Sequence, residues 1–486
     1  MSSSYFQYRC YSNHPHLKEL GRDLLSQYLQ SRRRKPPPKK QAKLTRAFVT
    51  AISGLVLGGA FNHHGYVVLI ALNKNHYTGR SRISPVLQPE LLEVFRWLIA
   101  DGYLQQVSDE SMIGGRWVPR GYRLTRKYLE LASQHPPDFK SPEILSSLGR
   151  NGLAPRVELR VNGRQVRLRP STEKDLSLKR LKSYDNRLES HRFELAGKVV
   201  PPSVFSLTRI YTGDYQHGGR YYSLFQQQPS QVRLNLFIDG EPTAEVDYKG
   251  LHPSLLYQRM GLEAPVDPYD VPGNAYPRSM VKKAFQVLVN RSNPAPAARS
   301  LVYWLNEHRR KRKPDPHDWE DKFDSINLKL CEELESTLYE HFKPISHFFC
   351  TGVGLELQHY DSQLVSHALD YFLVKTDSVF VPIHDSFLVK QSDLDTLAEA
   401  LRYAEVVQSR AWNLEYREPL LEAEVINQSE HYENNVSKFG IIEKTSYSEE
   451  QLLDQLTDLS PFNHHFYDQY LEDTQDEDQG DGKAAY

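Results

Sequence analysis

Two short apolar segments, far apart in the chain, each place an aspartate where a strand is predicted to end. Asp247 closes the segment 244–248. Asp385 lies at the break in 379–389, where two apolar runs flank a turn and predict a β-hairpin. Carboxylate oxygens are ligands that Mg²⁺ prefers. A fold that brings these strand ends together would let both aspartates share two metal ions, although either alone is also typical of a turn or a helix cap.

A cationic helix is predicted between the two acids. Arg278 and Lys282 are four residues apart, so a helix places them on one face, and Pro277 fits its first turn. An ordinary solvated helix face has the same pattern. Attack on a phosphate puts charge on the attacking and leaving oxygens, which a metal pair and positioned cations stabilise. The order acid, cationic helix, acid therefore indicates nucleotidyl transfer from nucleoside triphosphates.

These segments resemble the palm of family A polymerases, the group of the bacterial DNA polymerase I-type enzymes, and of the related phage-type single-subunit RNA polymerases. The family's strand-Asp-helix motif is matched at 247–253, its helix with Arg and then Lys at 278–282, and its His-Asp hairpin at 384–385. Upstream landmarks follow in the family's order: Gly219-Arg220, Gln228-Pro229, Arg233 and Phe237. The resemblance implies an α+β fold, with a right-hand polymerase palm and fingers built from an antiparallel sheet and helices.

The resemblance also implies a role for each matched residue. Asp247 and Asp385 would be the catalytic residues that hold two Mg²⁺ ions, with Mn²⁺ as a substitute, and the Tyr248 carbonyl would be a further metal ligand. Arg278 and Lys282 would bind the triphosphate. Contacts with the primer or template are implied for three more residues: Arg220, Arg233 and His384.

Three positions depart from the family's pattern. Asn290 replaces an aromatic Tyr eight residues after the helix Lys, which removes a ring that stacks on the incoming base or template. Ser386 stands where the DNA polymerases carry Glu and is closer to the RNA polymerases. His252 occupies the family's sugar-gate position, five residues after Asp247. A bulky side chain there should crowd a ribose 2′-hydroxyl, so we expect deoxynucleotides, with His252 and Asn290 at nucleotide-binding positions.

The net charge of −1 hides an asymmetry along the chain. Residues 1–200 contain 34 Lys and Arg against 16 Asp and Glu, whereas 472–481 is strongly acidic. A basic surface is typical of proteins that bind a polyanion such as DNA. The densest basic stretch, 32–40, contains three prolines that exclude a continuous helix. We expect an exposed basic linker there, which either contacts phosphates or is simply solvated.

Residues 42–134 have a pattern of their own. Helices are predicted at 44–57 and 89–101, followed by a β-hairpin and a last helix from Arg126. This order resembles a winged-helix domain, which in many proteins binds DNA through a recognition helix and a wing and in others serves only as a protein contact. Three arginines are expected on or near the wing: Arg116, Arg120 and Arg123.

We expect the following domain organisation. A basic N-terminal helix and Pro-rich linker (1–41) would precede the winged-helix-like DNA-binding domain (42–134), a connector or thumb-like region (135–200), the palm and fingers (201–440), and a C-terminal extension with an acidic tail (441–486). Within the connector, alternating residues predict an exposed strand pair at 156–169, and a charged helix is predicted at 171–194.

Several function classes lack their sequence signals. No apolar run reaches the roughly 18 residues of a membrane span, and no signal-peptide pattern is present, so we expect a cytoplasmic protein without membrane contact. The three cysteines are scattered and have neither disulfide nor metal-ligand spacing. A phosphate-binding loop of the ATP-driven helicases is absent, and the region before residue 200 is too short for a proofreading exonuclease beside the winged helix.

The sequence therefore predicts a DNA polymerase that acts on DNA by a two-metal mechanism without proofreading, with a primer-template and nucleoside triphosphates as partners. Such a compact enzyme would suit the replication of a plasmid, phage or mobile element. Two alternatives remain. Ser386 favours an RNA polymerase or primase, and Asn290 allows a non-catalytic replication initiator in which the winged helix binds DNA and the palm is a scaffold.

Overall fold

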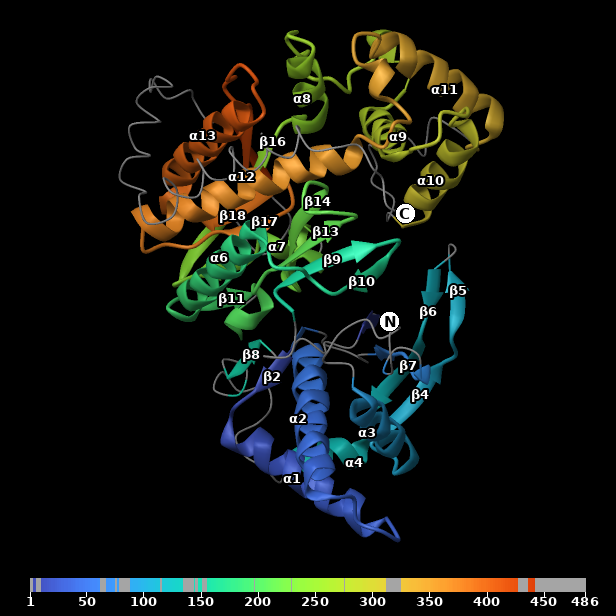
Figure 1. The fold of residues 1–486 in the computed structure, drawn as a ribbon, viewed down its shortest axis with the longest axis vertical. Coiled ribbons are helices and arrows are strands. Elements are labelled where there is room, and N and C mark those ends of the chain that lie inside the picture. Colours follow the sequence, from blue (N-terminus) through green and yellow to red (C-terminus); the bar gives the residue numbers. More distant parts are fainter. Residues whose placement is uncertain are drawn as a thin grey trace. The chain divides into compact units, whose positions relative to one another are not determined.

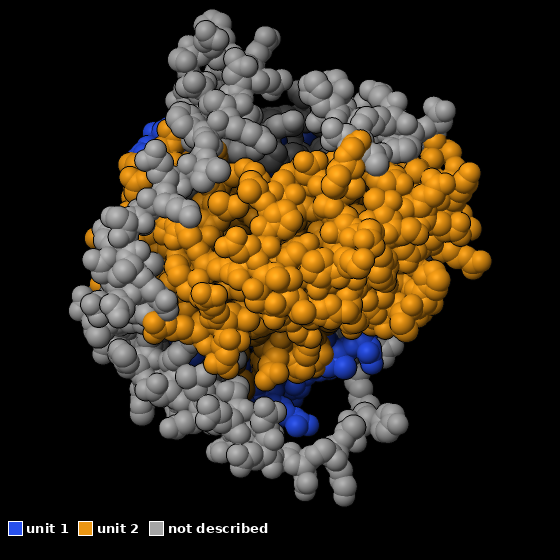
Figure 2. Space-filling model, turned by 90° about the horizontal axis from the view of Figure 1, so that it is seen from above, with its two compact units in different colours: residues 1–170, 174–209, 222–243 blue, residues 171–173, 210–221, 244–486 orange. Residues whose placement is uncertain are grey.

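The computed structural model describes residues 3–5, 10–61, 67–74, 77, 88–113, 116–133, 144, 147–150, 155–195, 197–228, 230–274, 276–311, 325–426 and 436–441. The chain forms two compact units, which are coloured separately in Figure 2. Unit 1 comprises residues 1–170, 174–209 and 222–243, and unit 2 comprises 171–173, 210–221 and 244–486. Both contain helices and predominantly antiparallel sheets (Figure 1), so the expected α+β class is confirmed.

The described residues in the first part of unit 1 include four α-helices: α1 (Pro15–Gln30), α2 (Pro38–Phe61), α3 (Pro89–Ala100) and α4 (Arg126–Ser133). The helix expected at 44–57 is part of the longer α2. The basic residues between α1 and α2 are exposed, as expected. Contacts between aromatic side chains link the first three helices. The ring centroid of Trp97 lies 5.8 Å from that of Tyr28 and 5.5 Å from that of Phe48.

The sheet of this part has the strand order β1-β3-β7-β4, with a separate β5–β6 hairpin. Strand β7 pairs antiparallel with β4, which confirms the pairing of the two strands expected after the second predicted helix, and it also pairs antiparallel with β3. The strands are β1 (Ser3–Tyr5), β3 (Val67–Ile70), β4 (Leu104–Ser108), β5 (Ser111–Ile113), β6 (Arg116–Val118) and β7 (Arg120–Leu124).

In the rest of unit 1, the described residues form short paired strands, two α-helices and two 3₁₀ helices. The strand pair predicted at 156–169 is confirmed by the antiparallel pairing of β9 with β10. The predicted charged helix ends at Glu189, because 193–195 form a strand that pairs with β12 and β15. The elements are β2 (Cys10–Ser12), β8 (Leu148–Arg150), β9 (Val157–Val161), β10 (Arg164–Val166), α6 (Thr172–Glu189), β11 (Phe193–Leu195), β12 (Lys198–Val200), η3 (Pro202–Val204), η4 (Phe225–Gln227), α7 (Ser230–Arg233) and β15 (Leu236–Ile238).

Unit 2 surrounds an antiparallel sheet with helices. Five strands of unit 2 share this sheet: β16 (Glu241–Tyr248), β17 (Val381–Ile383), β18 (Ser386–Lys390), β19 (Leu421–Ile426) and β20 (Val436–Ile441). Two others, β13 (Thr208–Thr212) and β14 (Gly218–Tyr222), are neighbours in a separate sheet. The helices of unit 2 are α8 (Leu251–Arg259), η5 (Pro272–Asn274), α9 (Arg278–Asn290), α10 (Ala298–Lys311), α11 (Leu328–His341), η7 (Ser346–Phe348), α12 (Gly354–Lys375), η8 (Gln391–Asp393) and α13 (Leu394–Ala411).

The centre of this sheet joins the two predicted acid-bearing strands. The β17–β18 hairpin forms as predicted, and β18 is the neighbour of β16. The Tyr248 N–H donates a 3.3 Å hydrogen bond to the Asp385 carbonyl, so the ends of the two segments are linked through the backbone. Helices α12 and α13 pack against each other beside the sheet (Figure 1). Phe380 connects α12 to the hairpin, with its ring 4.9 Å from Phe372 and 5.5 Å from Phe387.

Gly219 allows β14 to approach α12 closely. Its φ of 76° lies in the left-handed region that disfavours side chains, and a Cβ there would lie 2.8 Å from Tyr211 Cε1 and 3.0 Å from Ser362 Oγ. The close approach places the next residue, Arg220, over α12. Among the described residues, no helix has both the length and the apolar character needed to cross a membrane.

Replacing Gly219 with Ala should lower the free energy of unfolding by about 3 kcal/mol, because a left-handed side chain costs about 1–2 kcal/mol and overpacking adds a similar amount. Gly213→Ala is the matched control, since Gly213 has a φ of 86° but a Cβ there would meet no atom within 4 Å. That variant should lose only about 1 kcal/mol. Urea unfolding followed by circular dichroism measures both, and equal losses would show that contact with Tyr211 and Ser362 is unimportant.

Candidate active site

A cavity of about 530 Å³ in unit 2 collects most of the residues that the sequence predicted for a nucleotide site. The predicted residues that line it are Arg220, Tyr248, His252, Lys282, Asn290, His384 and Asp385. They come from β14, the β16–α8 connection, α9 and the β17–β18 turn, which are widely separated in the chain. Asp247 and Arg278 do not line this cavity.

Asp247 and Glu245 point to one side of β16, because side chains alternate along a strand. Glu245 is buried and accepts a 2.7 Å hydrogen bond from the Ser386 hydroxyl of the neighbouring strand. Asp247 is half-buried, and Glu422 of β19 pairs with it in register. This face of the sheet is therefore rich in carboxylates, and the Ser386 hydroxyl is hydrogen-bonded to one of them.

Burial and the charge of Asp385 raise the pKa of Asp247 to about 8, with smaller contributions from Glu245 and Glu422. Lys282 acts in the opposite direction. Asp247 therefore interacts electrostatically with Asp385 and Lys282, which line the cavity. An acid held close to another acid in a partly buried site is an arrangement that a divalent cation relieves, since the cation favours the charged form of both.

The two aspartates fit a metal ion in this respect. No cluster of three or more His, Cys, Asp or Glu side chains that could hold a metal is found in the described part of the chain. Asp247 and Asp385 would therefore need oxygen ligands from a bound molecule and water to complete an Mg²⁺ shell. The side chain of Tyr248 is buried and its hydroxyl donates a 3.1 Å hydrogen bond to the Leu401 carbonyl. A metal contact of its own carbonyl stays a prediction.

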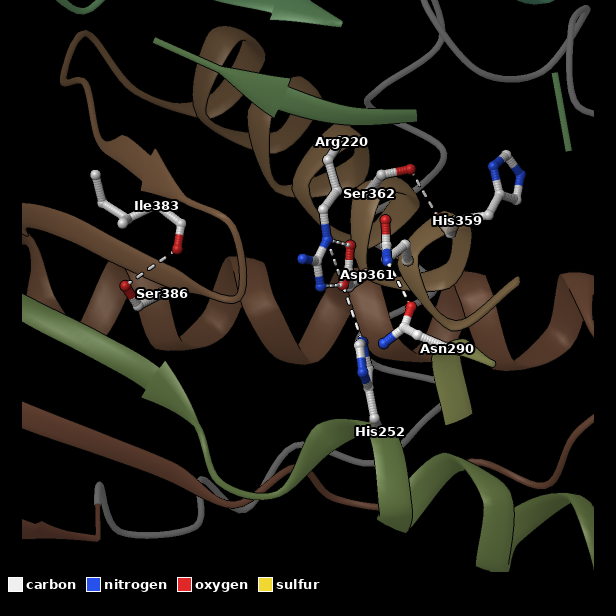
Figure 3. Close-up of polar contacts among 9 residues, drawn as sticks. Arg220, His252, Asn290, His359, Asp361, Ser362, Ile383 and Ser386 are labelled. Carbon is white, nitrogen blue, oxygen red and sulfur yellow. Dashed lines mark hydrogen bonds and ion pairs between the residues drawn. The ribbon is translucent and has the colours of Figure 1, made fainter. Parts of the chain in front are cut away.

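Asp361 on α12 is the anionic centre of a second polar group at the cavity. Figure 3 shows that Arg220 and His252 converge on its carboxylate. Arg220 Nε lies 3.1 and 3.0 Å from the two carboxylate oxygens, and His252 Nε2 lies 3.0 Å from Oδ2. Burial alone would raise the pKa of Asp361, but Arg220 and His252 outweigh it and lower the pKa. Arg220, expected to contact primer or template, has an ion-pair partner within its own unit.

The two cations predicted on helix α9 have different surroundings. Lys282 lines the cavity, whereas the Arg278 Nε lies 2.5 Å from the Asp267 carboxylate and the guanidinium lies 5.4 Å from the centre of the Tyr269 ring. Arg278 is at the first turn of α9, where a short loop carrying Asp267 reaches it. Its contact with a triphosphate stays a prediction that requires it to exchange this partner.

Asn290, at the last residue of α9, has amide partners on both sides. Its Nδ2 donates to the Gln286 carbonyl at 2.7 Å, and its Oδ1 accepts from Gln358 Nε2 at 3.3 Å. This contact joins α9 to α12 at the wall of the cavity. Asn290 thus closes the end of the helix by hydrogen bonds.

The other predicted nucleic-acid contacts belong to unit 1 or to the hairpin turn. His384 adopts a left-handed φ of 61° beside Asp385. Arg233 donates a 3.1 Å hydrogen bond to the Gln228 carbonyl. The three arginines expected near a wing lie on β6 and β7: Arg116, Arg120 and Arg123. Their contacts with DNA stay predictions.

The structure adds residues that the sequence did not single out. Glu245 could have been found, because it lies two residues before Asp247 and strand periodicity places both on one face. Lys283 and Trp304 also line the cavity, but neither belongs to a local pattern that marks it. Trp304 comes from α10, and only the packing of α10 against α9 brings it there.

No protein-family model matches the chain, and no curated protein matches it. Among solved structures, the chain is similar to the POL domain of Pol1 from M. smegmatis, in complex with DNA primer-template and dNTP. The two chains are 11% identical, with a TM-score of 0.27, over 51% of this chain and 50% of that chain.

Asp247→Asn should increase stability near pH 8. The unfolded chain ionises this carboxyl near its ordinary pKa, but the folded protein opposes ionisation until pH about 8. One pKa unit corresponds to about 1.4 kcal/mol, and solvent screening of a half-buried group reduces the total, so we expect a gain of about 2 kcal/mol. The gain should vanish near pH 4, where the unfolded wild type also takes up the proton.

Thermal unfolding between pH 4 and 8, with and without Mg²⁺, measures this effect. Mg²⁺ should stabilise the wild type and have little effect on Asp247→Asn. Asp395→Asn replaces an exposed acid in the same unit and should show no such gain. A loss of stability in Asp247→Asn at pH 8 would contradict the electrostatic conflict between the two aspartates.

Asp361→Asn should lower the free energy of unfolding by about 3 kcal/mol at pH 7, because it leaves the half-buried Arg220 without its counter-charge. The pKa of Asp361 is lowered in the folded protein, so its contribution is complete above pH 4 and is lost as the pH falls through the folded pKa. Glu356→Gln on the same helix breaks a more exposed pair with Arg259 and should cost less than about 1 kcal/mol. Comparable losses in the two variants at pH 7 would refute this role.

Proposed function

We propose that the protein is a template-directed nucleotidyltransferase, specifically a DNA polymerase that acts on DNA without proofreading. One observation carries the proposal: a single cavity joins Asp385, Lys282 and His252, and Asp247 interacts electrostatically with the first two. These residue types match the charges of the reaction, since carboxylates suit metal ions and an ammonium suits a triphosphate. The resemblance to family A palm motifs supports the same assignment.

In the proposed mechanism, Asp247 and Asp385 would hold Mg²⁺. When bound, a metal pair stabilises the charge on the attacking and leaving oxygens. Lys282, which lines the same cavity, would neutralise the triphosphate and stabilise the departing pyrophosphate. Glu245, fixed by the Ser386 hydroxyl, adds negative charge behind Asp247 and favours cation binding at this face.

His252 supports a preference for deoxynucleotides. Asp361 holds its Nε2, so the imidazole has a fixed position in the wall of the cavity. A fixed ring cannot rotate away from an added hydroxyl as a free side chain could. The proposed order of preference is therefore deoxynucleotides over ribonucleotides.

The first part of unit 1 supports a DNA-binding role as a winged helix. Three features support this proposal: helix α3 precedes β4 in the chain, β7 pairs antiparallel with β3 and β4, and the β5–β6 hairpin lies between β4 and β7 in the chain, where a wing would be expected. Arg120 is 41% exposed although it lies 3.6 Å from Glu110, so its charge is accessible to a phosphate. We propose that this part binds duplex DNA near the primer-template. A role in replication of a plasmid, phage or mobile element is a hypothesis beyond this.

Extension of a labelled primer on a DNA template with Mg²⁺ tests the proposal. The wild type should incorporate dNTPs in preference to rNTPs, and Asp385→Ala should reduce the rate at least about 1,000-fold because the metal site is lost. Lys282→Met should raise KM for the triphosphate and lower kcat, by about 100-fold in kcat/KM. Lys343→Met removes an exposed Lys of unit 2 and should leave the rate unchanged.

Other outcomes would support the alternatives. Synthesis from ribonucleotides without a primer would favour an RNA polymerase or primase, as Ser386 suggests by its resemblance. DNA binding without incorporation under any condition, and unchanged by Asp385→Ala, would favour the non-catalytic initiator. Incorporation that persists in Asp385→Ala would refute the assignment of the catalytic acids.

A further inference from the structure

Aromatic rings at the cavity differ sharply in their exposure. Four aromatic side chains line it: Tyr248, Tyr269, Phe285 and Trp304. The first three are 4%, 5% and 1% exposed and belong to the core, whereas Trp304 is 38% exposed. Trp304 is therefore the ring of this set whose face a ligand in the cavity can contact.

Helix α9 offers the cavity cations and amides in place of a reachable ring. Its lining residues at four-residue spacing are Lys282, Gln286 and Asn290. Its one aromatic residue, Phe285, packs with centroids 5.0 Å from Phe342 and 5.8 Å from Phe349. This ring is committed to the interior. An apolar, planar group in the cavity would therefore find its partner on the neighbouring helix α10.

The ring of Trp304 is supported from two directions. Tyr303 packs edge-on against it, with centroids 5.1 Å apart and planes at 84°. The Lys283 ammonium lies 5.7 Å from its centre, within the range of a cation–π contact. Lys283 also lines the cavity, so an ammonium group lies beside the ring within the same site. A flat ring next to ammonium groups is complementary to a base that carries phosphates.

We propose that Trp304 is the stacking surface for the base of the incoming nucleoside triphosphate. The base lies on the indole, and the phosphates extend to Lys282 and Lys283, toward Asp385. Stacking on an aromatic ring accepts every base, because each has a π face, so this contact adds affinity and leaves base choice to a template. The assignment rests on the proposed function and supplies from α10 the ring that Asn290 lacks.

Binding to the full-length protein without primer or template tests the proposal. Isothermal titration calorimetry with Mg²⁺ would compare dATP with inorganic tripolyphosphate, a probe that has the phosphates but no base. Trp304→Leu should weaken dATP binding about 10-fold, within the range measured for one stacked base. It should change tripolyphosphate binding less than about twofold. Trp304→Phe keeps a ring and should retain most of the affinity for dATP.

Lys282→Met is the matched control, because it should weaken dATP and tripolyphosphate alike. Circular dichroism and thermal unfolding would establish that each variant is folded, as expected for substitution of a partly exposed residue. In the wild type, dATP should also quench tryptophan fluorescence, and Trp304→Phe should remove that quenching.

Three outcomes would overturn the assignment. These are equal weakening of both ligands by Trp304→Leu, equal affinity of the wild type for both ligands, and an absence of binding. Primer extension separates this proposal from the function. Base-dependent binding through Trp304 in a protein that extends no primer would retain the stacking site and refute the polymerase, whereas extension unaffected by Trp304→Leu at limiting dATP would do the reverse.

Discussion

The candidate site in unit 2 depends on two aspartates, Asp247 and Asp385, that are held at the ends of neighbouring strands. The Tyr248 N–H and the Asp385 carbonyl link these ends at 3.3 Å. The apolar side chains beneath, including Val246 and Phe387, are buried and keep β16 and β18 together. The electrostatic cost of placing the two acids close together appears as the raised pKa of Asp247. Core packing therefore maintains a charge arrangement that the acids themselves oppose.

A comparison of Asp247 with Asp361 shows how the environment sets the direction in which the pKa of a carboxyl group shifts. Both are shielded from water, but Asp361 has Arg220 and His252 as partners and its pKa is lowered. Asp247 faces other acids, and its pKa is raised. An acid without sufficient internal counter-charge is a good candidate for binding an external cation. Asp361 instead fixes Arg220 and His252, two side chains that line the cavity.

Local patterns were sufficient for the secondary structure around the site. The strand ending near Asp247, the helix that carries Lys282, and the hairpin at Asp385 all formed where alternation and four-residue spacing predicted them. The interaction partners of the charged side chains could not be predicted from these local patterns. Helical spacing placed Arg278 beside Lys282, but the loop carrying Asp267 captured Arg278, and a loop's path is not encoded by periodicity.

The sequence by itself determined the types of chemical group available and the elements that carry them, because side-chain chemistry and the periods of strand and helix are local properties. It determined two acids at strand ends, a cation on a helix, and an amide side chain at Asn290. Only the tertiary structure decided which groups meet. The pairing of Arg220 with Asp361, the proximity of Glu245 to Ser386, and the presence of Trp304 beside Lys283 each depend on packing between distant segments.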